Sequence, residues 1–222
     1  MDYSKFFRVV WEDDYLIVLD KSPQVLVVAA PRRREPVLAD LVNEYLAPQK
    51  EKAYPAHRLD RTTSGLIIFA KSIFCQRNLM EQFRGRKVHK KYVAFVNGHP
   101  PERKGTLKGL IKKTPRAAAK LAVTKYRLMR KFSDFSILDI QPLTGRYNQI
   151  RIQLAQLGIP LVGERKYALG RQGLRFSRPA LHSYFVQFRH PVGKSLIEVK
   201  VGLASDMCEF LKKTAELDKF VI

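Results

Sequence analysis

The chain has 222 residues, 45% of them hydrophobic and 27% charged, which is typical of a soluble globular protein large enough to bury a core. Its 41 lysines and arginines exceed its 20 acidic residues, so the formal net charge is +21. The N-terminal segment lacks the basic start and long apolar run of a signal peptide, and no apolar run could span a bilayer. We therefore expect a cytoplasmic protein.

Short apolar or alternating runs, separated by turn residues, predict a chain rich in strands. No internal repeat or low-complexity linker interrupts them. The expected fold class is α+β, with a mixed, mostly antiparallel central sheet and peripheral helices. A cleft between two halves of that sheet would hold a central loop at its floor. The expected strands cover residues 6–10, 15–19, 66–70, 92–96, 107–111, 122–129, 135–140, 183–188 and 196–201, with a further short apolar run over 25–29.

Helices are expected between these strands. An apolar stripe predicts a helix over 36–46, with Pro36 in its first turn, and residues just before it, 31–35, should form a loop. A turn and a helix are expected over 144–158, and a last helix over 206–219 with Ser205 as its cap. Gly158 should end the former helix. A helix from the cap Ser72 to Arg84 should bury Ile73, Leu79, Met80 and Phe83.

The positive charge is concentrated in one part of the chain. Between Arg84 and Lys131 there are sixteen lysines or arginines and one acid, Glu102. A solvated surface usually mixes both signs, because a field of one sign repels itself. Nucleic acid is the favoured partner. An anionic membrane surface is the rival, but it usually needs a basic amphipathic helix, and this segment predicts strands.

Metal and cofactor sites are not indicated. Cys75 and Cys208 stand far apart without a CxxC pair, so we expect two buried thiols and neither a disulfide nor a zinc site. His57 and His182 lack the spacing of metal ligands. Because no glycine-rich phosphate loop is present, no nucleotide cofactor is implied.

One acid stands between two arginines in the stretch AHRLDRTTSGLIIFAKS, residues 56–72. Asp60 lies between Arg58 and Arg61 and precedes a polar turn and a buried-type strand. Neighbouring guanidinium groups would keep its carboxylate ionised, and an ionised carboxylate can attack an electrophilic carbon. On these residues alone, a structural ion pair that closes the turn is the favoured alternative.

Two further stretches carry candidate residues. In TGRYNQIRIQLAQLGIPLVGERKY, residues 144–167, Asn148 and Arg151 are three apart and share a helix face. In KVHKKYVAFVNG, residues 87–98, Tyr92 opens an apolar strand after a basic cluster, so its ring could stack on a base. Taken singly, a surface arginine and a core tyrosine are the simpler interpretations.

Together these stretches resemble the RluA-type RNA pseudouridine synthases. HRLDRTTSGL is similar to the central motif of that family almost letter for letter, KKYVAFV to its tyrosine-bearing strand, and TGRYNQIR with LGIPLVGE to its third motif. WEDDYLIVLDKSPQVLV resembles the usual start of the family, and LHS with FRHP its closing part. The resemblance extends roughly from residue 8 to 203.

The resemblance implies that a uridine of ribosomal RNA or tRNA, in a loop or bulge, is flipped into a basic cleft and isomerised without metal or cofactor. Asp60 would attack the ribose C1′, or remove the 2′ proton in a glycal route. Tyr92 would stack on the base, and Arg151 would pair with Asp60. Arg58 would fill the gap left by the flipped nucleotide. Contacts to RNA are expected from Arg58, Arg61, Lys90, Lys91, Lys112, Lys113, Arg146, Asn148 and Gln149.

The sequence also departs from the family pattern. Tyr147 and Asn148 stand where a small residue and a histidine are usual, and Glu164 replaces an aspartate. Many members carry a small N-terminal RNA-binding domain, whereas we expect residues 1–222 to form a single catalytic domain and a monomer. The basic segment would then supply the grip on RNA. A non-catalytic RNA-binding or ribosome-assembly factor on the same fold is the alternative.

Overall fold

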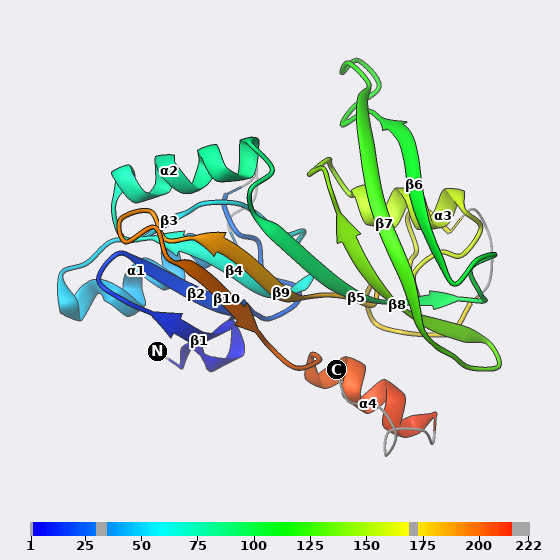
Figure 1. Cartoon of the computed structure of the whole chain (residues 1–222). Coiled ribbons are helices and arrows are strands. Elements are labelled where there is room, and N and C mark those ends of the chain that lie inside the picture. The colour runs from blue at the N-terminus through cyan, green and yellow to red at the C-terminus, as the bar shows by residue number, and fades with distance from the viewer. Residues whose placement is uncertain (1, 30–34, 169–172, 215–222) are drawn as a thin grey trace. The chain divides into compact units, whose positions relative to one another are not determined.

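The structure is a computed structural model that describes residues 2–29, 35–168 and 173–214 (Figure 1). The chain divides into two compact units. The first comprises residues 1–89 and 183–204, and the second comprises residues 90–182 and 205–222. None of the helices in the described ranges has the length and hydropathy needed to cross a membrane.

The first unit is a sheet with two helices. Its strands follow the order β1-β2-β4-β9, and two short strands join that path, β3 at β4 and β10 at β9. β1 pairs with β2, and β2 with β4, in antiparallel ladders. Short 3-10 turns, Tyr3–Lys5 and Ala47–Gln49, precede β1 and follow α1. The strands are β1 (Phe7–Glu12), β2 (Leu16–Lys21), β3 (Tyr54–Pro55), β4 (Ser64–Ala70), β9 (Leu181–Arg189) and β10 (Leu196–Lys200), and the helices are α1 (Leu38–Leu46) and α2 (Ile73–Arg84).

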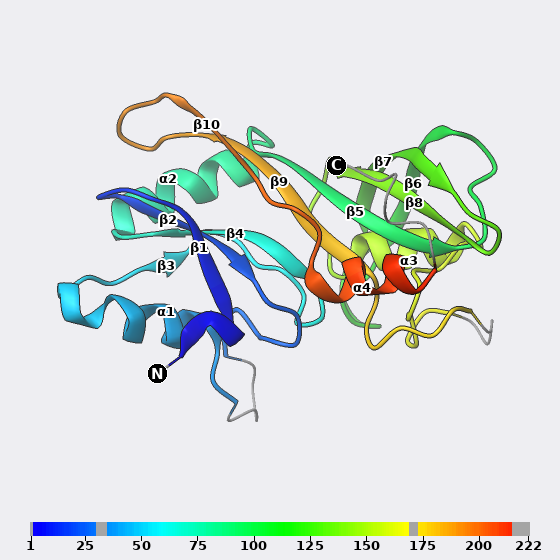
Figure 2. The same ribbon diagram turned by 90° about the horizontal axis from the view of Figure 1, so that it is seen from below.

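Strands β2 and β4 are buried on both faces. Alternate residues of a strand point to opposite faces, and Leu16, Val18 and Ile68 pack with Cys75 and Leu79 of α2 in one core cluster. The residues that alternate with these point to the other face and are also fully buried, namely Ile17 and Leu19 of β2 and Ile67 and Phe69 of β4. Figures 1 and 2 show α1 and α2 on opposite sides of these strands. The loop that precedes β4 is therefore attached to a strand that is buried along its whole length.

The second unit is a four-stranded antiparallel sheet in the order β5-β8-β7-β6. β6 and β7 form a long hairpin, visible in green in Figure 1. Helix α3 is tied to this hairpin by Gln153, whose buried amide donates to the carbonyl oxygens of Leu107 (3.1 Å) and Ala122 (3.1 Å). The elements are β5 (His89–Asn97), β6 (Lys104–Ile111), β7 (Lys120–Lys131), β8 (Phe135–Pro142), α3 (Gln149–Gln156) and α4 (Ser205–Lys213).

The predicted fold class is confirmed, and so are several local signals. Ser72 caps α2 by accepting a hydrogen bond from the backbone N–H of Cys75 (3.2 Å). Gly158 follows α3 with a φ of +89°, the left-handed conformation expected of a helix stop. The run 25–29 forms only a bridge between Leu26 and Val37. The expected loop over 31–35 lies outside the described residues except for its last member, and so does the end of the last helix.

Some expectations about burial and boundaries are wrong. Ile73 and Met80 are each 43% exposed, because α2 presents only Cys75 and Leu79 fully to the core. Helix α1 begins at Leu38, so Pro36 precedes it. Cys75 is buried as expected, whereas Cys208 is only half-buried on α4. These errors concern tertiary contacts that a local pattern does not contain.

Gly65 gives the first prediction. Its φ is +109°, and a Cβ there would lie 2.2 Å from the backbone oxygen of Ser183 in β9. Gly98 has a φ of +73° but nothing within 4 Å of such a Cβ. We expect Gly65→Ala to lower the free energy of unfolding by several kcal/mol, and Gly98→Ala by only about 1 kcal/mol, the cost of the backbone strain. Chemical denaturation measures both, and equal losses would contradict the close contact with β9.

Candidate active site

Asp60 lies on a short turn directly before β4, in the first unit. Its backbone carbonyl accepts a hydrogen bond from the N–H of Thr63 (3.0 Å), which closes the turn. Leu59 is buried at 5% exposure, whereas Asp60 is half-buried and Arg58 is exposed. The buried leucine and the buried start of β4 hold the turn from both sides, so the carboxylate is presented from a fixed backbone.

A buried lysine fixes the same turn. Lys21, at the end of β2, is fully buried, and its ammonium donates to the carbonyl oxygens of Ser22 (2.8 Å), Val25 (3.0 Å) and Arg61 (3.3 Å). A buried ammonium group is costly unless its protons find acceptors. These three bonds link the backbone beside Asp60 to the segment after β2. Lys21 is thus a structural support of the candidate site that the sequence did not single out.

The side chain of Arg61 is engaged within the first unit. Its guanidinium lies 3.1 Å from a carboxylate oxygen of Glu35 and donates to the carbonyl of Gln24 (3.2 Å). This ion pair lies at the surface, where both groups are more than a third exposed, so it is weak. Arg61 can exchange it for an RNA phosphate, and its contact with RNA stays a prediction.

Tyr92 is the first buried residue of β5, in the second unit. It is 6% exposed and lies opposite Ile140 of β8 in the ladder. Lys90 and Lys91, which precede it on the same strand, are half-buried. The strand thus passes from a basic end into the core at Tyr92, and the stacking of the Tyr92 ring on a base stays a prediction.

Arg151 is held by a buried carboxylate. Its Nε and Nη2 donate to the two carboxylate oxygens of Glu164 at 2.7 Å and 2.8 Å. The Glu164 side chain is fully buried, and its Oε1 also accepts from the backbone N–H groups of Lys166 (2.8 Å) and Tyr167 (3.3 Å). Burial by itself would raise the pKa of Glu164, but the hydrogen bonds and charge of Arg151, together with the two N–H donors, outweigh it and lower the pKa.

A second set of contacts holds the face of the same guanidinium. The Tyr167 ring lies 5.3 Å from the Arg151 Cζ, a cation–π distance. The Tyr167 hydroxyl accepts a hydrogen bond from the side-chain amide of Asn148 at 2.7 Å. The ammonium of Lys166 lies 5.2 Å from the Tyr167 ring and 5.5 Å from the Tyr147 ring. Contact with Tyr167 is the main reason that the pKa of Lys166 is raised.

Two of the residues predicted to contact RNA are buried in this structure. Asn148 is 6% exposed and uses its amide on Tyr167, with a backbone φ of +47° at the start of α3. Gln149 is 5% exposed; its amide donates to Val123 and Thr124 and accepts from Thr144 and from the N–H of Arg146. These bonds show that both side chains support the fold. Their contact with RNA stays a prediction.

The remaining predicted contacts lie at the surface of the second unit. Arg146 is half-buried and donates to the carbonyl of Leu121 (3.0 Å) on β7. Lys112 and Lys113 are exposed in the turn that joins β6 to β7. Directly below that turn, alternate residues of the hairpin project into solvent, and several are basic. The exposed basic residues of the two strands are Lys104, Lys108, Lys120, Lys125, Arg127 and Lys131.

Metal ions in proteins are bound by groups of side chains that carry nitrogen, sulfur or oxygen ligands. Within residues 2–29, 35–168 and 173–214 there is no group of three or more histidine, cysteine, aspartate or glutamate side chains placed to hold an ion. The predicted catalytic side chains are Asp60, on a turn of the first unit, and Tyr92 and Arg151, on β5 and α3 of the second.

The sequence matches the family model described as RNA pseudouridylate synthase over residues 15–156. It is 39% identical over 159 residues to an uncharacterized RNA pseudouridine synthase of Chloroflexus aurantiacus, covering 68% of this chain and 50% of that protein. It is 30% identical to ribosomal large subunit pseudouridine synthase D of Xylella fastidiosa, covering 94% of this chain and 69% of that protein. The chain thus spans between half and about two thirds of the length of these relatives.

A solved structure shares the fold. The human protein titled RNA pseudouridylate synthase domain containing 4 superposes with a TM-score of 0.80 at 21% sequence identity, over 93% of this chain and 92% of that one. The family model includes the positions of Asp60, Tyr92 and Arg151. The resemblance drawn from the motifs is confirmed as a family relationship.

The lowered pKa of Glu164 gives the second prediction. A carboxyl whose pKa is lower in the folded state adds stability above its unfolded pKa near 4.5, and that stability is lost as pH falls through the folded value. Glu164→Gln should therefore lower the free energy of unfolding at pH 7, with a difference from the wild type that shrinks below about pH 4.5. Denaturant titrations between pH 3 and 7 measure it. Glu209→Gln, at an exposed position on α4, is the control, and a pH-independent loss for Glu164→Gln would contradict the ionised pair.

Proposed function

The chain belongs to the RNA pseudouridylate synthase family, and on that premise we propose that it isomerises uridine to pseudouridine at defined positions of a structured RNA. The observation that carries the proposal is Asp60, an acid on a turn fixed by Lys21 and by the buried start of β4. It lies in the motif HRLDRTTSGL, inside the matched range. Ribosomal RNA is the first substrate to test, because the Xylella relative is named for the large ribosomal subunit; tRNA is the second.

The proposed reaction begins when the target uridine leaves its stack, at a cost of a few kcal/mol, which a loop or bulge keeps low. The Asp60 carboxylate attacks the ribose C1′ and the glycosidic bond to N1 breaks, or it removes the 2′ proton and a glycal forms. The uracil leaves with the electron pair of the N1 bond, turns, and forms a new bond from C5 to C1′. As that bond forms, the C1′–oxygen bond to Asp60 breaks, or, in the glycal route, Asp60 returns the proton to C2′. Loss of the C5 proton and gain of a proton at N1 complete the isomerisation, so that no atom is gained or lost overall.

Each surrounding residue has a proposed task. Tyr92 stacks on the uracil and assists removal of the C5 proton. Arg151 pairs with Asp60 and keeps it ionised, because an adjacent positive charge favours the charged form. Arg58, exposed on the Asp60 turn, fills the gap that the flipped nucleotide leaves. The task of Asn148 is to position Tyr167, and through it the guanidinium of Arg151.

Asp60 gives the third prediction. Asp60→Asn keeps the shape of the side chain but removes the charge that attacks the ribose, so pseudouridine formation should fall to background while RNA binding is retained. Pseudouridine mapping of RNA measures the first, in cells that lack the protein and are restored with wild type or variant. Filter binding measures the second.

A matched control removes an equivalent charge elsewhere. Asp40 is exposed on α1, and Asp40→Asn should restore every site that the wild type restores. An active Asp60→Asn variant would exclude Asp60 as the nucleophile. If deletion of the protein changes no site, the enzymatic proposal fails and a non-catalytic RNA-binding factor takes its place.

The turn between β6 and β7 gives the fourth prediction. If Lys112 and Lys113 contact phosphates, replacing both with glutamine should weaken RNA binding and reduce the slope of log K against log salt by about two units, one for each contact. Binding isotherms at several salt concentrations measure the slope. The control is the double change of Lys212 and Lys213 to glutamine on α4, which removes the same charge from another exposed surface. Equal slopes for the two variants would show that the turn does not touch RNA.

A further inference from the structure

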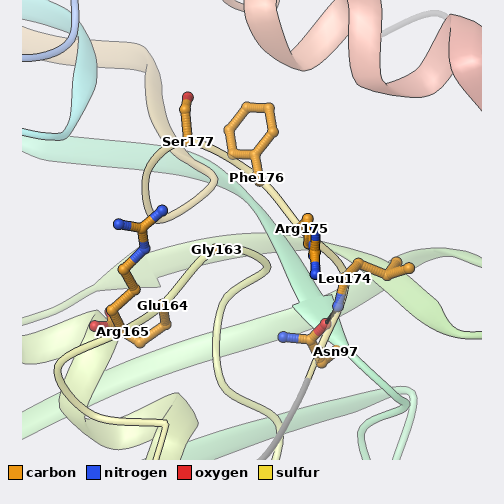
Figure 3. A pocket seen from close by; sticks show the side chains of 9 residues that line it. Asn97, Gly163, Glu164, Arg165, Leu174, Arg175, Phe176 and Ser177 are labelled. Atoms are coloured by element: carbon orange, nitrogen blue, oxygen red, sulfur yellow. Dashed lines mark hydrogen bonds between the residues drawn. The ribbon is translucent and has the colours of Figure 1, made fainter.

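A pocket in the second unit shares Glu164 with the Arg151 ion pair and is otherwise lined by residues not yet described. Its volume is about 570 Å³, within the usual range of about 300–1,000 Å³ for small-molecule sites. Two consecutive stretches, Gly163–Arg165 and Gly173–Ser177, form its walls together with Asn97 at the end of β5. Figure 3 shows Arg165 and Arg175 on two sides of the hollow, with the Gly163 backbone between them. The size suits one nucleotide and excludes a duplex.

The described walls of this pocket carry positive charge. Arg165 and Arg175 are both exposed, so their guanidinium groups are available to a ligand. Among the lining residues that the structure describes, Glu164 is the one acid, and its two carboxylate oxygens are bound by Arg151 and by the backbone N–H groups of Lys166 and Tyr167. The acid therefore does not neutralise the two arginines. A pair of guanidinium groups is well suited to phosphate oxygens, which accept charge-assisted hydrogen bonds.

The backbone of the pocket is fixed before any ligand arrives. Asn97 donates to the carbonyls of Pro160 (3.3 Å) and Leu161 (3.2 Å) and accepts from the N–H of Leu174 (2.9 Å), so it joins the two walls. At Gly163 a Cβ would lie 2.2 Å from the backbone oxygen of Arg178, so only glycine allows the walls this close. Such a frame reduces the entropy cost of ordering a bound nucleotide.

Buried Arg178 anchors the end of the second wall. Its guanidinium donates to both carboxylate oxygens of Asp206 on α4 (2.7 Å and 2.9 Å) and to the carbonyl of Leu181 (3.1 Å). Phe176, two residues earlier, is half-buried and lies 5.6 Å from Phe210 of α4. The aromatic ring is thus held at the wall, next to the exposed hydroxyl side chain of Ser177.

These features together select a class of ligand. The guanidinium groups suit a phosphate, and the exposed planes of Arg165 and Arg175 offer surfaces on which an unpaired base can stack. The Phe176 ring beside them already has the Arg178 guanidinium 5.7 Å from its centroid, so a base can lie only against the part of the ring that this contact leaves open. Four of the described lining residues, Arg165, Gly173, Arg175 and Ser177, are exposed, so the pocket is open to solvent. An open pocket suits a nucleotide that is part of a strand, because the strand must enter and leave.

We propose that this pocket binds one unpaired nucleotide of the substrate RNA, with its phosphate between Arg165 and Arg175 and its base against Phe176. The inference rests on the proposed function, because it assigns the pocket to the RNA strand that carries the target uridine. Glu164 lies in the wall and also holds Arg151, so the bound nucleotide is a near neighbour of the target in the strand. The pocket then helps to select the uridine by fixing its flanking sequence.

The first experiment is photocrosslinking. Ribosomal RNA and tRNA transcribed with 4-thiouridine are bound to the full chain, irradiated and digested, and crosslinked peptides are identified by mass spectrometry. We expect crosslinks on the peptide that contains Phe176, and their loss when Arg165 and Arg175 are both changed to glutamine. Arg77→Gln, at an exposed position on α2, is the control and should keep them. The absence of crosslinks at Phe176, or their persistence in the double variant, would overturn the proposal.

The second experiment uses turnover on the RNA that pseudouridine mapping identifies. The double variant should raise KM about tenfold and reduce the salt slope of binding by about one unit for each lost phosphate contact, while Arg77→Gln changes neither. Shortening the RNA next to the target should raise the wild-type KM by a similar factor and leave that of the double variant unchanged. A KM in the double variant equal to that of Arg77→Gln would overturn the pocket assignment.

The two proposals fail in different ways. Wild-type protein that modifies no RNA refutes the enzymatic function, whereas the crosslinks still decide whether a nucleotide occupies the pocket. Active wild-type protein whose crosslinks and KM are unaffected by the double change refutes the pocket alone. Thermal unfolding of each variant identifies loss of folding, and the single changes Arg165→Gln and Arg175→Gln then replace the double variant, each with about half of its effect on the salt slope.

Discussion

The candidate site depends on one buried ion pair, that of Arg151 with Glu164. A fully buried carboxylate costs several kcal/mol to desolvate, and only complete pairing makes it acceptable. Here two guanidinium N–H groups and two backbone N–H groups supply that pairing. Four hydrogen bonds fix the position of the carboxylate, and the carboxylate fixes the plane of the guanidinium. The Tyr167 ring then supports one face of that plane, so Arg151 has a defined orientation before RNA binds.

The distribution of charge follows the same division between buried and exposed groups. Carbonyl or carboxylate oxygens bind the cations inside the fold, at the buried Lys21 and Arg178 and at the half-buried Arg151. On the β6–β7 hairpin, by contrast, Lys104 lies directly opposite Arg127 in the ladder, a destabilising pairing of like charges, and Arg127 has Asp139 as a partner at 3.4 Å. A fold that neutralises its internal cations but keeps a repulsive basic surface gains stability from a polyanionic ligand.

Local signals in the sequence predicted local structure well. Ser72 and Gly158 act at the helix ends where their chemistry belongs, because a cap needs only the residues beside it. The hydrogen-bond partners of residues far apart in the sequence could not be predicted from local patterns. Lysine is usually a surface residue, so nothing in the sequence indicated that Lys21 is buried. Its hydrogen bond to the carbonyl oxygen of Arg61 depends on the folded arrangement of the chain. Gln149 follows a turn in a basic motif and suggested RNA contact, yet its amide joins α3 to β7. In both residues a polar group forms hydrogen bonds inside the protein, and the spacing of apolar residues in the sequence does not indicate such bonds.

Asn148 stands where a histidine is usual in the family, and this difference has a physical consequence at the start of α3. Asparagine is among the residues that tolerate a left-handed backbone, so it accepts the φ of +47° at the start of α3. Its amide donates to the Tyr167 hydroxyl and has no proton to lose or gain between pH 5 and 8, whereas an imidazole titrates in that range. The support of Tyr167, and through it the orientation of Arg151, is therefore independent of pH near neutrality. In this structure Asn148 bonds to Tyr167, whose ring lies against Arg151, and a direct contact of Asn148 with RNA stays a prediction.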